Sequence, residues 1–190
     1  MPDLEIRSLT ECRVGIAPNG RTIEGYAIVF DSLSQDLGGF REVIRPEAVD
    51  RTLKEALDVR ALVDHDSGKV IGRTRAGTLN LRKDPRGLRV SIDPPNTTAG
   101  RDILESISRG DVSGMSFAFR ALTDDWRTEN GTPVRDVSDM TISEVSVVAF
   151  PAYSATNVDV AQRSLREFQA RQASSPIALL RRKLQLTLAR

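Results

Sequence analysis

Three short segments of this 190-residue sequence carry side chains that can act as a base, a nucleophile and a carboxylate partner. The first is residues 62–66 (LVDHD), in which the chain's one histidine, His65, follows a compact apolar run. Imidazole accepts and returns a proton near neutral pH, so His65 at the end of a strand is a candidate general base. The alternative is a surface histidine, or a structural one whose hydrogen bonds are satisfied.

The second segment, residues 113–119 (SGMSFAF), alternates large and small side chains as a β-strand does. Alternation directs the methionine and phenylalanines into the core and leaves Ser116 among small neighbours on the other face. A stiff strand with open space above the hydroxyl suits a nucleophile. A serine that simply faces solvent is the alternative. Ser113, three residues upstream, is a competing nucleophile that is held less rigidly.

The third segment, residues 141–151 (TISEVSVVAFP), places Glu144 at the head of a valine-rich strand. A buried charge needs a partner. The N–H of a histidine is one such partner, and a carboxylate there fixes the tautomer of the ring and stabilises imidazolium. A salt bridge to one of the many arginines is an equal alternative.

The elements that must position these residues are mostly strands. Apolar alternation, turn residues and prolines predict two hairpins, one of them turning at Asn130-Gly131, and two helices, the second ending at Gly110. The predicted strands span 22–30, 40–44, 59–63, 78–81, 88–92, 112–122 and 140–150. Residues 126–137 predict the hairpin at Asn130-Gly131, and the predicted helices span 46–57 and 98–110. This order predicts a β-rich α+β fold, a barrel or sandwich with helices on its surface. Parallel βαβ units are poorly supported, because most strands follow one another without a crossover helix.

Composition excludes several classes of protein. One cysteine, Cys12, and one histidine exclude an intramolecular disulfide, argue against a Cys/His zinc site, and fit a reducing compartment. We expect no metal or cofactor. No apolar run is long enough for a membrane span, and the first residues lack the apolar core of a signal peptide. The 27 basic and 26 acidic residues give no global field that would favour nucleic acid.

The balanced charge hides an asymmetry between the body and the C-terminal tail. Residues 161–190 hold seven basic residues and one acid, a net charge of +6, whereas residues 1–160 carry a net charge of −5. Residues 171–176 (RQASSP) predict a polar connector, and residues 176–190 predict a basic amphipathic helix. Such a helix can bind a membrane surface or an acidic partner, or dock on its own domain. We therefore expect a body of 1–160 and a separate tail of 161–190.

Taken together, these segments resemble the caudovirus prohead maturation protease family. The residues that carry the resemblance are VDHD around His65, VSGMSFAF around Ser116 and residues 142–153 (ISEVSVVAFPAY), together with IEGYAIVFD and IRPEAV near the N-terminus. They occur in the same order over roughly residues 4–160. One small departure is Ala118, where the family commonly has glycine. The family's fold resembles that of the herpesvirus assemblins, a mostly antiparallel β-barrel ringed by helices.

The resemblance implies a serine endopeptidase that works inside the immature phage capsid, in the host cytoplasm. It implies His65 as general base, Ser116 as nucleophile and Glu144 as the third member of the site. The implied substrates are the scaffold protein or the scaffold-like segment of the major capsid protein, and the enzyme itself, including its tail. The resemblance is also compatible with a homo-oligomer. A non-catalytic capsid assembly module with the same barrel, working through its basic tail, is the competing interpretation.

Overall fold

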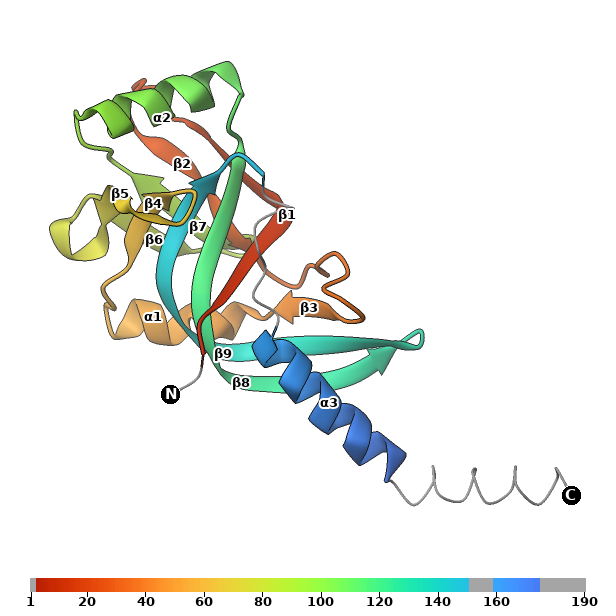
Figure 1. Cartoon of the computed structure of the whole chain (residues 1–190). Coiled ribbons are helices and arrows are strands. Elements are labelled where there is room, and N and C mark those ends of the chain that lie inside the picture. The colour runs from red at the N-terminus through yellow and green to blue at the C-terminus, as the bar shows by residue number, and fades with distance from the viewer. Residues whose placement is uncertain (1–2, 151–158, 175–190) are drawn as a thin grey trace, which may run out of the picture. The chain divides into compact units, whose positions relative to one another are not determined.

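A single bent sheet forms the body of the protein. The computed structural model describes residues 3–150 and 159–174, and the chain divides into two compact units, residues 1–157 and 158–190. Nine strands, counted within the described residues, make one sheet that curves into a nearly closed barrel (Figure 1). Its order is β5-β4-β9-β8-β1-β2-β7-β6, and β3 pairs with β9 outside that path. The predicted β-rich α+β barrel is confirmed.

The strands and helices have the following bounds. The strands are β1 (Glu5–Ile16), β2 (Ile23–Val29), β3 (Arg41–Ile44), β4 (Arg60–Val63), β5 (Asp66–Arg73), β6 (Leu79–Lys83), β7 (Gly87–Ile92), β8 (Gly114–Glu129) and β9 (Thr132–Val148). The helices are α1 (Asp50–Lys54), α2 (Thr98–Arg109) and α3 (Asp159–Ala173), and two 3₁₀ turns cover Pro46–Val49 and Thr74–Ala76. In the part of the chain that the structure describes, no helix is both long and apolar enough to cross a bilayer.

The long hairpin of β8 and β9 is the centre of the sheet. It turns at Asn130 and Gly131, which both have positive φ (50° and 83°), as a two-residue turn of the primed type requires. One face of the hairpin is apolar and enters the barrel core, where Phe117, Phe119 and Val145 are fully buried. The predicted turn and the predicted core face are both present.

Helix α2 lies over one end of the barrel (Figure 1). Its first turn is capped by Thr97, whose hydroxyl accepts the N–H of Gly100 at 3.3 Å. Ile103 and Ile107 are buried, and Gly110 ends the helix in the left-handed conformation, as predicted from the sequence. The other predicted helix is shorter than expected: a 3₁₀ turn from Pro46 leads into α1, which ends at Lys54.

Three features differ from the sequence-based expectations, and a fourth expectation is not tested. Strands β1 and β5 were not predicted, because the charged residues of β1 and the mostly exposed small and charged residues of β5 break the apolar alternation. Strands β3 and β4 pair with β9 in parallel, so the sheet is mixed, though most of its pairings are antiparallel. The expected connector begins inside a helix, since α3 continues to Ala173. The predicted amphipathic helix of 176–190 lies outside the described residues.

Candidate active site

His65 lies on a tight turn that reverses the chain between β4 and β5. Asp64 and His65 are the two central residues, and both have positive φ, 48° and 60°. Such a turn favours asparagine, aspartate and glycine, so a histidine there is conformationally costly. The N–H of Asp64 donates to the carbonyl of Val147 at 3.0 Å, and Asp64 Oδ1 accepts the N–H of Ala149 at 3.2 Å. These bonds hold the turn against the end of β9.

Ser116 lies on β8 between two neighbouring strands. It is directly opposite Ser8 of β1 and Ser146 of β9 in the register of the sheet. The expectation of open space above the hydroxyl was wrong, because Ser116 is 0% exposed. Its Oγ donates to the carbonyl oxygen of Arg7 at 2.9 Å and also contacts the ring of His65. Pairing of β1 with β8, which the sequence did not predict, provides that carbonyl.

A β-bulge in β9 determines where Glu144 points. Phe119 pairs with Ile142 and Ala118 pairs with Glu144, so Ser143 is an extra residue on β9. Ile142 and Val145 both enter the core despite being three residues apart, and the bulge accounts for this change of phase. Glu144 therefore lies on the opposite face from Val145. The small side chain of Ala118, directly across from Glu144, leaves room for the carboxylate.

The three predicted site residues meet through two short contacts. His65 Nε2 lies 2.8 Å from Ser116 Oγ, and Nδ1 lies 2.5 Å from Glu144 Oε1. The side chain of Glu144 is 12% exposed and that of His65 is 18% exposed, so the contacts are largely shielded from water. Of the two alternatives for Glu144, the contact with His65 is the one observed. The ring nitrogen contacts Ser116 rather than the competing Ser113, which lies before β8 begins.

A fourth side chain, Ser146, completes the set and was not singled out in the sequence. Ser146 is fully buried, its Oγ donates to Glu144 Oε2 at 2.6 Å, and it accepts the backbone N–H of His65 at 3.3 Å. The signal for it was present, since Ser146 alternates in phase with Glu144 on a valine-rich strand. A serine in so apolar a segment needs hydrogen-bond partners.

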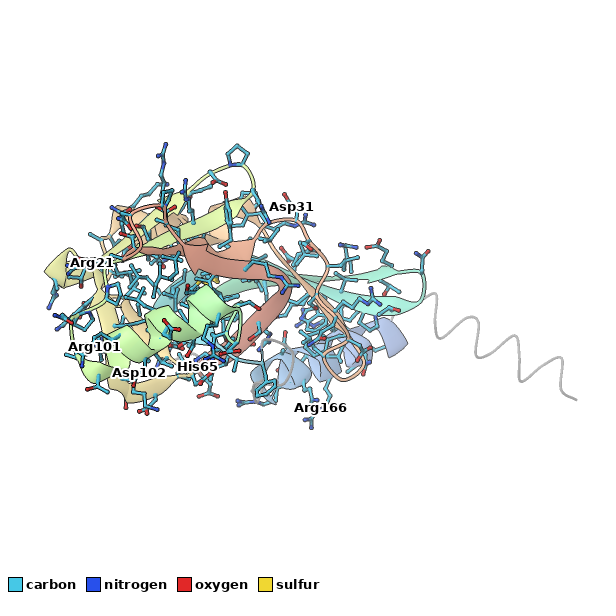
Figure 2. All side chains as sticks on the ribbon, turned by 90° about the horizontal axis from the view of Figure 1, so that it is seen from above. Arg21, Asp31, His65, Arg101, Asp102 and Arg166 are labelled. Carbon is cyan, nitrogen blue, oxygen red and sulfur yellow. The ribbon has the colours of Figure 1, made fainter. Side chains whose placement is uncertain are left out.

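A cleft of about 490 Å³ opens beside the turn that carries His65. The residues that line it include the apolar Val63 and Ile103 and the acidic Asp64 and Asp102. Figure 2, seen from above, shows His65 and Asp102 on the same side of the body, where α2 lies. The site is therefore next to a hollow between α2 and the β4–β5 turn.

Comparison with known proteins finds one matching family and a similar fold. Among curated proteins, no sequence matches the chain significantly. A solved structure, that of the bacteriophage T4 capsid assembly protease, gp21, is similar in fold at a TM-score of 0.51 and 12% identity, covering 77% of this chain and 98% of that one. Residues 4–171, most of the chain, match the sequence profile described as "Caudovirus prohead serine protease". That match covers well over half of the chain and shows that the chain belongs to the caudovirus prohead serine protease family.

Proposed function

We propose that Ser116 is the nucleophile, His65 the general base and Glu144 the orienting carboxylate of a serine endopeptidase that matures the phage prohead. The observation that carries this proposal is the unbroken line of contacts from Ser116 Oγ through both ring nitrogens of His65 to Glu144. A serine hydroxyl is a weak nucleophile until a base removes its proton, and the base must be held in one tautomer to do so. The contacts of His65 with Ser116 and with Glu144 support both parts of this proposal.

The reaction begins when Ser116 Oγ attacks the scissile carbonyl and His65 Nε2 takes the hydroxyl proton. The imidazolium so formed is stabilised by Glu144 through Nδ1, and it then protonates the leaving amine. Water hydrolyses the acyl-enzyme in the reverse sense, with His65 again acting as base. The Ser116 hydroxyl has one proton and faces two acceptors, the Arg7 carbonyl and His65 Nε2. Attack therefore requires the hydroxyl to turn away from Arg7.

The proposed substrates are the scaffold protein or the scaffold-like segment of the major capsid protein, and the protease itself. Family membership supports proteins of the capsid as substrates, and the similar T4 structure is itself described as a capsid assembly protease. We place the activity inside the immature capsid, before the shell matures. The tail beyond residue 160 is the segment we expect the enzyme to remove from itself.

A serine-directed fluorophosphonate tests the proposal without a known cleavage sequence. We expect the probe to label the wild-type protein at Ser116, as identified by mass spectrometry of peptides, and Ser116→Ala to remove the label. His65→Ala should reduce labelling to a similar extent, since the two residues act as a unit. Ser113→Ala is the matched control and should label like the wild type. Co-expression with the phage capsid protein, followed by mass spectrometry of the products, then identifies the bonds that are cut.

Two outcomes would reject the proposal. A folded wild-type protein that never labels would favour the non-catalytic assembly module. Cleavage of the capsid protein by Ser116→Ala at the wild-type rate would transfer the role of nucleophile to another residue.

A further inference from the structure

We infer that Ser146 is a positioning residue of the site, which holds the carboxylate of Glu144 and the turn of His65 in one arrangement. The inference rests on the proposed function and adds a fourth side chain to it. Ser146 donates its single hydroxyl proton to Glu144 Oε2 at 2.6 Å. The lone pairs of the same oxygen accept the backbone N–H of His65 at 3.3 Å. One hydroxyl therefore joins the two residues that must remain aligned.

The two oxygens of Glu144 are divided between two donors. Oε1 faces the ring Nδ1 of His65, and Oε2 accepts from Ser146. A carboxylate held at one oxygen alone can rotate about its last bond, whereas one held at both cannot do so without losing a bond. The second donor therefore fixes the plane of the carboxylate, and with it the direction in which Nδ1–H points. In this way Ser146 acts on the base through Glu144.

The place of Ser146 in the sheet brings it close to the other three residues of the site. Its backbone pairs with Leu62 of β4, three residues before His65, and with Ser116 of β8. Leu62, Ser146 and Ser116 therefore lie side by side on the adjacent strands β4, β9 and β8. Ser146 is fully buried, and its neighbours Val145 and Val147 are apolar. A hydroxyl in such surroundings is costly unless its bonds are made, and both of its bonds are made within the site.

The effect of losing this hydroxyl can be measured as the rate of fluorophosphonate labelling. We expect Ser146→Ala to lower the maximal labelling rate by about 10- to 100-fold, the range for one hydrogen bond to a charged group. The probe concentration at half-maximal rate should change little, because Ser146 does not face the probe. The pH–rate profile for labelling should change as well, because the ring that takes the Ser116 proton is oriented through the carboxylate that Ser146 holds. A purely structural serine would leave the profile unchanged.

A double-mutant cycle tests whether Ser146 acts through Glu144. In the Glu144→Gln background the carboxylate is already lost, so adding Ser146→Ala should lower the labelling rate further by less than about threefold. Equal losses in both backgrounds would overturn the inference. Ser138→Ala is the matched control, because Ser138 lies on the same strand and its hydroxyl donates to the carbonyl of Thr123. It should label like the wild type.

Two further variants keep the test decisive if Ser146→Ala does not fold. Ser146→Thr retains the hydroxyl and suits a strand, so it should retain most of the labelling rate. Ser146→Cys has a similar shape but a weak donor, so it should be slow. Circular dichroism confirms the fold of each variant. A folded Cys variant with the wild-type rate and pH profile would refute the role of Ser146 while leaving the proposed function intact. Absence of labelling in the wild type would instead reject the proposed function.

Discussion

Glu144 is a carboxylate on a valine-rich strand, and its Oε1 contacts the ring of His65. Replacement by glutamine keeps the shape of the side chain but removes the charge that favours imidazolium. We therefore expect Glu144→Gln to keep the fold and to cut capsid protein more slowly, by about 100-fold or more, without abolishing cleavage. Initial rates against pH measure the effect. A glutamine variant as fast as the wild type would leave Glu144 as a structural residue only.

The backbone at His65 adopts a strained conformation. Asp64 and His65 both adopt left-handed φ values, which aspartate tolerates but which cost a residue such as histidine about 1–2 kcal/mol. Two bonds from Asp64 to β9 hold the turn in spite of this. Strain of this kind persists only where the surrounding structure determines the conformation. The strained turn thereby sends the imidazole toward Ser116.

At the scale of elements, charged residues inside the barrel join three strands. The buried ion-pair cluster consists of Glu5 and Arg7 of β1, Glu42 of β3 and Arg135 of β9. All four side chains are at most 3% exposed. Burial alone would lower the pKa of Arg135, but the carboxylates of Glu42 and Glu5 outweigh burial and raise it. The cluster fixes β1, whose Arg7 carbonyl contacts Ser116.

Replacing one member of this cluster should destabilise the fold severely. Arg135→Met would leave Glu5 and Glu42 buried with one cation fewer, and such losses cost about 3–5 kcal/mol of unfolding free energy. Denaturant unfolding followed by circular dichroism gives the value. Arg89→Met is the control, since its pair with Glu24 is exposed and should be worth less than about 1 kcal/mol. If both variants lost a similarly small amount of unfolding free energy, the buried cluster would contribute no more to stability than an exposed ion pair.

Over the whole molecule, carboxylates that pair between elements should make the fold sensitive to acid. The hydrogen bonds from Arg73 lower the pKa of Asp58, and those from Arg51 lower the pKa of Asp139. The unfolded chain then binds more protons than the folded one as the pH falls. Their contribution is complete above the ordinary aspartate pKa of about 3.9 and is lost as the pH falls below it.

We therefore expect the melting temperature to fall steeply below about pH 4. Asp58→Asn is the diagnostic variant for the Arg73 pair. It should melt below the wild type at neutral pH, and the gap should close as the pH falls, because the wild-type pair is then also lost. Calorimetry from pH 7 to pH 2.5 measures both curves. A gap that stays constant with pH would show that Asp58 does not contribute through its charge.

The tail provides the last prediction at the scale of the whole molecule. We expect the protease to trim residues beyond 160 from itself, and the +6 tail to carry it to the acidic interior of a growing shell. A chain truncated after residue 160 should cleave capsid protein but fail to enter procapsids, whereas full-length Ser116→Ala should enter and stay uncut. Intact mass and procapsid pull-down measure the two effects. A wild-type mass that remains 20.9 kDa after long incubation, or equal packaging of both chains, would contradict this view.

The sequence by itself predicted a β-rich fold, the turn at Asn130-Gly131 and the helix end at Gly110, which follow from local causes, namely alternation and turn chemistry. The choice of a barrel, and of His65, Ser116 and Glu144 as candidate site residues, came from the resemblance of several motifs in one order to a known family. Only the tertiary structure decided that β1 lies beside Ser116, that β4 runs parallel to β9 and that a bulge at Ser143 turns Glu144 out of the core. Strand pairing and register depend on contacts between residues far apart in the chain, which a pattern in one segment does not contain. For the same reason Ser146 was an ordinary strand serine until its partners, Glu144 and His65, were beside it.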